Sequence, residues 1–250
     1  MELRPDTELT AEIERLRAEL ARREREAADN ERQLERYAAD LRETFKEERA
    51  RSLQLSRSYA ATVRALAGAV EARDAYTGKH AERVAAYGIE LARALGMARP
   101  EAPEIEFGFL LHDIGKVAIP DRILYKPGSL SDEERALMNR HPVIGAEIVS
   151  GIEFLTEAAE VVRSHHERWD GSGYPDGLCG DEIPVAARVF AVADVFDALT
   201  TDRPYRPAST LAEARDIISR ESGSHFDPRV VDAFNAIDNE TFIRIGNVAL

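Results

Sequence analysis

The sequence has 250 residues, of which 44% are hydrophobic and 32% charged, and its formal net charge at pH 7 is -13. This length suits one domain with a sizeable core plus an accessory segment, and the acidic balance argues against non-specific binding to nucleic acid or to an anionic membrane. The single cysteine, Cys179, excludes an intramolecular disulfide, and no signal peptide or apolar run of roughly 20 residues is present. We therefore expect a cytoplasmic protein that binds neither membranes nor nucleic acid polymers.

The N-terminal segment predicts one long helix. Residues 7–58 contain no glycine or proline and are rich in the strong helix formers Glu, Arg, Ala and Leu. Apolar residues with alternating spacings of four and three form a seam of Leu9, Ile13, Leu16, Leu20, Ala27, Leu34 and Leu41. Arg23 and Asn30 interrupt this seam. Such a narrow stripe favours a parallel dimeric coiled coil over residues 1–58, and a single charged helix in solvent is the alternative.

Residues 59–250 predict an all-α domain, because almost nothing in them alternates with a period of two. Two helices are expected on either side of a break at Tyr76-Thr77-Gly78. Further helices are expected at 104–113, 132–139, 143–150, 156–166, 184–199 and 211–219. Ser131 and Glu134 have the spacing of a capping box, and Asp227-Pro228 is an N-cap followed by a proline at the first helical position, which begins the last clear helix.

Histidines and aspartates point to a metal site. The six histidines are His80, His112, His141, His165, His166 and His225. The first five fall within a stretch of less than a hundred residues, at predicted helix ends or beside carboxylates, and Asp113 directly follows His112. Imidazoles mixed with carboxylates suit Fe, Mn, Zn, Co or Ni, whereas the lack of thiolates argues against a cysteine-rich structural zinc site. A lone histidine is more often a surface or core residue, but five so close together favour a metal centre.

Three blocks carry a family resemblance. LLHDIGK at 110–116, HHERWDGSGYPDG at 165–177 and ADVFDALTTDRPYR at 193–206 resemble the signature blocks of the HD-GYP family of HD-domain metal phosphohydrolases. The resemblance covers roughly residues 60–237. It implies an HD-domain helical bundle with additional helices around the GYP loop, over residues 59–250, preceded by the coiled-coil helix.

The resemblance also implies a set of metal ligands: His80, His112, Asp113, His141, His165, His166 and Asp194. Asp113 would bridge two ions, one held with His80, His112 and Asp194 and the other by the later histidines. Some family members hold a third metal through a glutamate four residues before the first histidine, but that position is Tyr76 here. We therefore expect two divalent metal ions, iron or manganese.

The ligand set suits hydrolysis of a phosphodiester. Metal ions can activate a water molecule and neutralise the phosphate oxygens, so no protein nucleophile is needed. Asp113, as the bridging ligand, and Lys116 are the expected catalytic residues. Lys116 lies four residues after His112 and can face the same cavity, where the family lysine contacts phosphate; a solvated lysine at a helix end is the alternative.

The substrate implied by the resemblance is cyclic di-GMP, opened to linear pGpG and in some members cut further to GMP. Arg203 and Arg206 match family positions that meet phosphate or guanine, which suits the planar fork of arginine; a surface turn with a salt bridge is the alternative. Asp74 and Asp197 match carboxylates that orient a metal ligand or the substrate guanine. Lys116, Arg203, Arg206 and the metal ions would supply the local positive charge that an anionic substrate needs on a protein with a net negative charge.

The GYP loop follows His165 and His166. In the family, Gly173, Tyr174 and Pro175 mainly support the site and are credited with contacts to diguanylate cyclase domains. The composition of this loop agrees at least as well with a structural role, as a cap on the helix end that carries His165 and His166, as it does with contact to the substrate. Cys179 stands where related sequences have a lysine, but no ligand is lost by this difference.

Three functions are compatible with these motifs. The first is a cyclic di-GMP phosphodiesterase in bacterial second-messenger signalling, dimeric through its coiled coil and regulated by a sensor or cyclase partner. The second is a non-catalytic module that senses the nucleotide or docks a cyclase, which loss of a ligand would favour. The third is a phosphodiesterase for another cyclic dinucleotide. The complete ligand set favours an enzyme.

Overall fold

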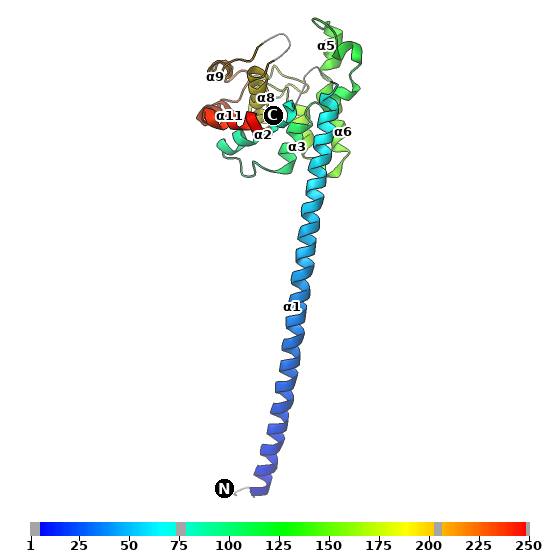
Figure 1. Cartoon of the computed structure of the whole chain (residues 1–250), viewed down its shortest axis with the longest axis vertical. Helices are drawn as coiled ribbons and strands as arrows, with labels where there is room; N and C mark the ends of the chain where they lie inside the picture. Colours follow the sequence, from blue (N-terminus) through cyan, green and yellow to red (C-terminus); the bar gives the residue numbers. More distant parts are fainter. Residues whose placement is uncertain (1–5, 74–78, 203–206, 249–250) are drawn as a thin grey trace. The chain divides into compact units, whose positions relative to one another are not determined.

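The computed structural model describes residues 6–73, 79–202 and 207–248. The predictions for Asp74, Tyr76, Arg203 and Arg206 fall outside these ranges. Within them every regular element is a helix and no β-strand occurs, which confirms the all-α prediction (Figure 1). The longer helices are α1 (Asp6–Glu71), α2 (His80–Ala94), α3 (Pro103–Leu110), α6 (His141–Ser150), α8 (Val185–Thr200), α9 (Leu211–Arg220), α10 (Pro228–Ala236) and α11 (Asn239–Val248). The shorter ones are α4 (Asp121–Leu124), α5 (Asp132–Met138), α7 (Ala158–Ser164) and the 3-10 helices η1 (Ile114–Ala118), η2 (Glu153–Leu155) and η3 (Gly180–Glu182).

The chain divides into two compact units, Met1–Ser58 and Tyr59–Leu250. The described part of the first unit is helical throughout, as its composition predicts. Its seam leucines are exposed over about half or more of their surface, for example Leu16 at 53% and Leu41 at 71%. An apolar stripe of this kind is what the prediction of a coiled coil requires.

Helix α1 continues beyond Ser58 to Glu71, so the helix expected before the Tyr76–Gly78 break is the end of α1 rather than a separate element. Composition changes near Ser58 but no helix breaker stands there, and Gly68 lies in the helix with open space around it. The new helix α2 begins only after Lys79, whose backbone is left-handed with φ 60°.

The capping predictions are confirmed. The Ser131 hydroxyl and the Glu134 carboxylate form the reciprocal capping box of α5, and the Asp227 carboxylate caps α10 with Pro228 in its first turn. Sequence analysis missed α11, because its short apolar pattern becomes recognisable only where Phe242, 2% exposed, packs into the core. It also extended the helix after residue 104 to Asp113, whereas α3 ends at Leu110 and a turn follows.

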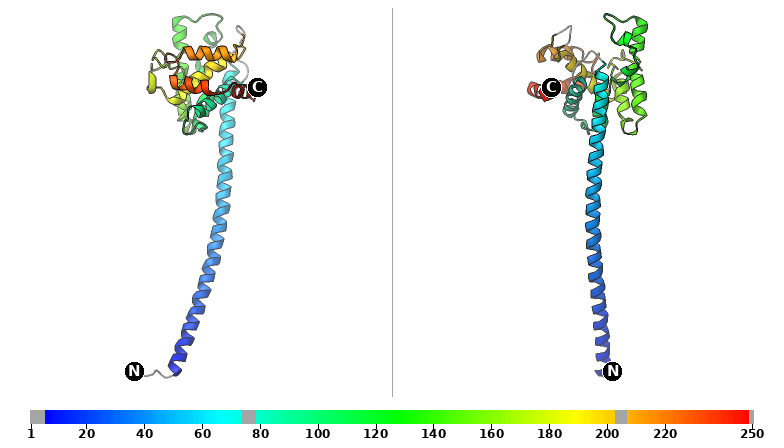
Figure 2. Two further views of the ribbon diagram at one scale, coloured as in Figure 1. Left: turned by 90° about the vertical axis from the view of Figure 1, so that its left-hand side faces the viewer. Right: turned by 45° about the vertical axis from the view of Figure 1, so that its right-hand side comes forward.

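The core of the second unit lies between helices that are distant in sequence. Helix α2 packs on α8, and α7 packs on α6 and α3. Phe109, Phe190 and Phe196 are completely or almost completely buried in this core. The C-terminal helices α9 to α11, coloured orange to red in Figure 2, gather around α2 and α8. This packing brings the predicted metal ligands together.

Candidate metal centre

The predicted ligands form two adjacent groups. In one, donor atoms of His80, His112 and Asp194 lie within 4.8 Å of one another, and in the other those of His141, His165 and His166 do. Asp113 lies between the groups: its Oδ2 is 3.1 Å from His112 Nε2 and its Oδ1 is 3.3 Å from His141 Nε2. The structure therefore brings all seven side chains into one cluster.

Each of these side chains comes from a helix end or from the middle of α8. His80 and His141 are the first residues of α2 and α6, and His165 follows the last residue of α7. His112 and Asp113 occupy the turn between α3 and η1. Helix ends let side chains from several directions converge on one point, which a single helix face cannot do.

A close backbone contact places the His112-Asp113 turn against α6. A Cβ atom added to Gly115 would lie 1.9 Å from the carbonyl oxygen of His141 and 2.6 Å from the amide nitrogen of Gly145. Only a residue without a side chain allows η1 to approach α6 so closely. Gly115 in the HDIGK motif therefore sets the distance between Asp113 and His141.

Hydrogen bonds to the backbone determine which nitrogen of each ring is available. His112, His141 and His165 each direct Nδ1 at the carbonyl oxygen three residues earlier. These acceptors are Phe109, Met138 and Val162, at 2.9, 2.8 and 2.7 Å. Because a carbonyl can only accept, Nδ1 carries a hydrogen in each ring, and in a neutral ring Nε2 then keeps its lone pair. The three Nε2 atoms are therefore the nitrogens available to the cluster.

The contact between His141 and His165 calls for a cation. Their Nε2 atoms are 3.2 Å apart, although both are hydrogen-bond acceptors in this tautomer. Two facing lone pairs repel unless a proton or a metal ion lies between them. Burial, and next the neighbouring histidines, hold the pKa of His165 well below its ordinary value, which disfavours the proton. The donor set therefore fits a metal ion.

Burial also lowers the pKa of His141, and it lowers that of His166 to about 3. Both rings are therefore neutral and have a lone pair to offer to a metal ion. For Asp113, burial by itself would raise the pKa, but the neighbouring His112 and Lys116 outweigh it and hold the pKa well below its ordinary range. Neutral imidazoles beside an ionised carboxylate are the donors that divalent Fe, Mn and Zn accept.

His80 is held between two aspartates. Its Nδ1 lies 2.8 Å from Asp197 Oδ2 and its Nε2 lies 3.4 Å from Asp194 Oδ1. Burial would lower the pKa of His80, but the contacts with Asp194 and Asp197 outweigh it and raise this pKa to about 10. The two carboxylates thus favour a positive charge at this point, which a proton or a metal ion can supply.

Asp197 has an orienting position. Its side chain is 2% exposed, and Arg83 Nε donates to its Oδ1 at 2.6 Å while His80 faces Oδ2. Of the two roles that the sequence suggests, this placement favours the orientation of a ligand over contact with substrate. Arg83 was missed by sequence reasoning, although its position three residues after His80, on the same face of a helix, was a usable signal.

Lys116 faces the same cavity. Its Nζ lies 2.7 Å from Asp113 Oδ2, and the cavity of about 210 Å³ is lined by Lys116, His80, His112, Asp113, His166 and Asp194. The expectation rested on an α-helical spacing from His112, whereas the structure has a turn and a 3-10 helix. The lysine nevertheless points into the cavity, because η1 packs on α6.

The GYP loop packs against His166. The Tyr174 ring stacks on the His166 ring with centroids 4.7 Å apart, and the Tyr174 amide donates to the His166 carbonyl at 3.3 Å. The buried Glu167 carboxylate, another residue that sequence reasoning missed, accepts the amides of Asp176 and Leu178 at 2.8 and 3.1 Å. A Cβ on Gly173 would lie 2.4 Å from the Arg168 nitrogen. These contacts favour a supporting role for the loop.

Comparisons with known proteins agree with this geometry. The sequence model of the family described as HD domain matches residues 24–230. The RpfG protein of Xanthomonas campestris pv. campestris, described as a cyclic di-GMP phosphodiesterase response regulator, is 48% identical over 174 residues, which are 69% of this chain and 46% of the relative. A 3'3'-cGAMP-specific phosphodiesterase 2 of Vibrio cholerae is 45% identical over 195 residues, 77% of this chain and 35% of the relative. The chain thus spans between about a third and a half of these relatives.

A solved structure shares the fold. An HDG"Y"P protein of Bdellovibrio bacteriovorus superposes with a TM-score of 0.54 at 24% identity and covers 72% of this chain and 63% of its own. The family match runs through the elements that carry His80, His112 and His141 as well as the GYP loop. The chain therefore belongs to the HD-domain family, and its signature blocks place it in the HD-GYP branch.

Proposed function

We propose that the chain hydrolyses a cyclic dinucleotide, foremost cyclic di-GMP to linear pGpG, which a second cleavage would convert to GMP. The observation that carries this proposal is the convergence of imidazole nitrogens and carboxylate oxygens beside Lys116 at one cavity. A phosphodiester needs neutralisation of its charge and a strong nucleophile, and such a donor set is suited to both.

The proposed cofactors are two divalent metal ions, iron or manganese. His80, His112, Asp113 and Asp194 would hold one ion, and Asp113, His141, His165 and His166 the other, in line with the two groups of donor atoms. When bound, the ions supply charge neutralisation for the phosphate and activation of water as the nucleophile.

The protein side chains have distinct tasks in this proposal. The Lys116 ammonium would bind a phosphate oxygen and stabilise the leaving oxygen. Lys116 directly follows Gly115 in η1. The backbone carbonyls that accept from Nδ1 keep the imidazoles in one orientation, and Asp197 does the same for His80. Arg203 and Arg206 are proposed to meet phosphate or guanine, and Asp74 to orient a ligand or the guanine.

The substrate is supported by relatives. Cyclic di-GMP is favoured by the 48% identity to a cyclic di-GMP phosphodiesterase and by a second such enzyme, from Thermotoga maritima, at 46% identity over 172 residues. A cyclic GMP-AMP substrate is the second candidate, favoured by the 45% identity to a 3'3'-cGAMP-specific phosphodiesterase. Both substrates require the same metal chemistry.

We further propose the division of labour that the sequence predicts: a coiled-coil homodimer over residues 1–58 and a phosphodiesterase domain over residues 59–250. The exposed apolar seam of α1 supports the first part. A diguanylate cyclase or a sensor protein is the proposed regulatory partner, with the GYP loop as its contact. Among the described helices none combines the length and apolar character of a membrane span.

The test is turnover by the full chain purified anaerobically and loaded with Fe(II) or Mn(II). Cyclic di-GMP and 3'3'-cGAMP are each supplied, and products are separated by chromatography. We expect linear dinucleotide from cyclic di-GMP, and we expect its loss in a variant with both His112→Ala and Asp113→Ala. His225→Ala is the matched control, because His225 stacks on Phe226 outside both donor groups. Absence of product with either metal would leave the non-catalytic module as the function.

A further inference from the structure

The start of α2 lacks a cap from its own N-cap residue. This helix begins at His80, and its N-cap residue, Lys79, makes no capping hydrogen bond with its side chain. Lysine cannot do so, because its ammonium only donates. The amide groups in the first turn of a helix have no partner within the helix and need an acceptor from elsewhere. The position of His80 depends on how that need is met.

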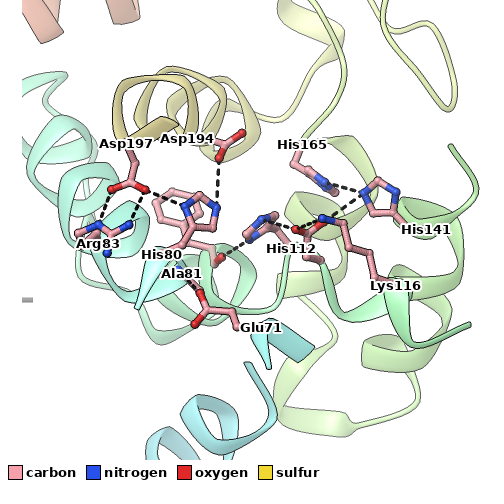
Figure 3. Close-up of polar contacts among 12 residues, drawn as sticks. Glu71, His80, Ala81, Arg83, His112, Lys116, His141, His165, Asp194 and Asp197 are labelled. Atoms are coloured by element: carbon pink, nitrogen blue, oxygen red, sulfur yellow. Dashed lines mark hydrogen bonds and ion pairs between the residues drawn. The ribbon is translucent and has the colours of Figure 1, made fainter. Parts of the chain in front are cut away.

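Glu71, the last residue of α1, supplies the acceptor. Its Oε1 accepts the backbone amide of Ala81 at 2.5 Å, across ten residues of sequence (Figure 3). Ala81 is only 3% exposed, so water has little access to replace this bond. A carboxylate at the positive end of the helix is also favoured by the helix dipole. Glu71 therefore acts as a long-range cap on the helix that begins with His80.

Arg73, two residues further, contacts the segment that follows Lys116. Its Nη1 donates to the carbonyl oxygen of Val117 at 3.0 Å, and its Nη2 pairs with Asp121 Oδ1 at 2.6 Å. Val117 follows Lys116 in η1, and Asp121 is the first residue of α4. Glu71 at the end of α1 is thus bonded to the helix of His80, and Arg73, just beyond α1, to the 3-10 helix that carries Lys116.

We propose that Glu71 and Arg73 are positioning residues that hold His80 and Lys116 in place on either side of the cavity. Glu71 also lines this cavity, together with Ala67 and Val70 of α1. This inference rests on the metal site of the proposed function, because its consequence is the placement of a metal ligand. Neither residue touches the reacting atoms in this proposal; both act through the elements that they bond.

The test compares Glu71→Ala, Glu71→Gln and wild type in the full chain. Loss of a helix cap typically costs about 1 kcal/mol, which corresponds to roughly a fivefold change in the equilibrium constant for forming the first helical turn. We expect Glu71→Ala to bind Mn(II) about fivefold more weakly in equilibrium dialysis without substrate. Amides in the first turn of α2 should exchange hydrogen faster by a similar factor. Glu71→Gln keeps a carbonyl acceptor and should recover most of both losses.

Arg93→Ala is the matched control, because it removes exposed ion pairs with Glu90 and Glu101 at the other end of α2. Arg73→Ala provides a second variant: it should raise the KM for the cyclic dinucleotide more than it changes Mn(II) affinity, and Arg73→Lys should restore part of the loss.

The outcomes separate the two proposals. If wild type binds no Mn(II), the proposed metal site fails. If wild type binds Mn(II) while Glu71→Ala has the same affinity and the same exchange rates as Arg93→Ala, the positioning role of Glu71 is overturned. If Glu71→Ala does not fold, Glu71→Gln and Glu71→Leu are compared with wild type instead. The role is supported if Glu71→Gln has the Mn(II) affinity and the exchange rates of wild type while Glu71→Leu does not. It is overturned if Glu71→Gln and Glu71→Leu have the same Mn(II) affinity and the same exchange rates.

Discussion

The tautomers of the buried histidines are the most informative feature of single residues in this chain. Carbonyl oxygens three residues earlier bind Nδ1 of His112, His141 and His165, which directs each Nε2 toward the cluster. The short Nε2 to Nε2 contact between His141 and His165 is repulsive without a cation. Local backbone geometry thus fixes the orientation of the rings, which is the role that partners of metal-binding histidines have in general.

The buried Asp197 should control the affinity of the site for metal. In Asp197→Asn one carboxylate oxygen becomes an NH2 group, which only donates, so a single oxygen remains to accept from His80 and Arg83. We expect metal affinity or turnover to fall about tenfold to a hundredfold, as is typical when a partner of a ligating histidine is lost. Equilibrium dialysis with Mn(II) measures the effect. Asp181→Asn, at a carboxylate that is 73% exposed, should change it little.

Asp227 should make stability depend on pH. Burial would raise its pKa, but hydrogen bonds from Arg229 and Arg188 outweigh it and lower the pKa below the unfolded value of about 3.9. Its stabilisation is therefore complete above about pH 5 and is lost as the pH falls through 4 and lower. Asp227→Asn keeps the helix cap but loses the charge, and we expect about 2 kcal/mol lower unfolding free energy at pH 7.

Urea unfolding of wild type and Asp227→Asn at pH 7, 5 and 4 provides the measurement. The difference between the two proteins should be constant from pH 7 to 5 and should shrink at pH 4. A difference that grows on acidification would contradict the assignment of the ionised carboxylate as the stabilising form.

Helices converge on the site through their ends, and this depends on close backbone contacts between elements. The 3-10 helix η1 lies against α6 because Gly115 has no side chain. The GYP loop folds back onto Glu167 and Arg168 because Gly173 has none. Glu71 at the end of α1 is bonded to α2, and Arg73, two residues later, is bonded to η1. No helical spacing or other local repeat in the sequence indicates these contacts, whether the partners are five residues apart, as Gly173 and Arg168 are, or 44, as Arg73 and Val117 are.

Gly115→Ala should disrupt the contact between η1 and α6. Its Cβ would meet the His141 carbonyl at 1.9 Å, so the backbone must shift. We expect a loss of about 1–3 kcal/mol in unfolding free energy, and a fall in turnover of up to about a hundredfold, because Asp113 moves relative to His141. Urea unfolding and a turnover assay measure the two effects.

Gly68→Ala is the control for this substitution. Gly68 lies inside α1 with nothing within 4 Å of an added Cβ. There we expect a gain of about 0.5–1 kcal/mol from higher helix propensity and no change in turnover. Equal effects of the two substitutions would show that the contact at Gly115 does not matter.

The whole molecule combines an exposed helical unit with a compact helical unit. The seam of α1 over residues 9–41 has the spacing of a coiled coil, and its large apolar residues are between 45% and 71% exposed. Association of two copies would bury this stripe. The polar residues Arg23 and Asn30, which interrupt the seam, would select one register of pairing at some cost in stability.

Charge in the seam should therefore prevent dimerisation. We expect the double variant Leu16→Glu and Leu20→Glu to sediment as a monomer at a concentration where the wild type is a dimer, because like charges would face each other across the seam. Leu53→Glu is the control, since Leu53 is exposed to a similar extent, 54%, but lies outside the spacing of the seam. Equal sedimentation of all three proteins would contradict the coiled coil.

The sequence by itself determined the helical class, the long helix over residues 7–58, the capping box of Ser131 and Glu134, the N-cap at Asp227, and the identity of the clustered histidines and aspartates. Each of these depends on local propensity, on spacing, or on motifs such as HDIGK and GYP. Tertiary structure alone decided that Asp197 is enclosed by His80 and Arg83, that Tyr174 covers His166, and that Glu71 caps α2. These contacts depend on how helix ends and loops meet in the folded chain, over ten residues for Glu71 and Ala81 and over 117 for His80 and Asp197, and neither separation belongs to a repeating local pattern.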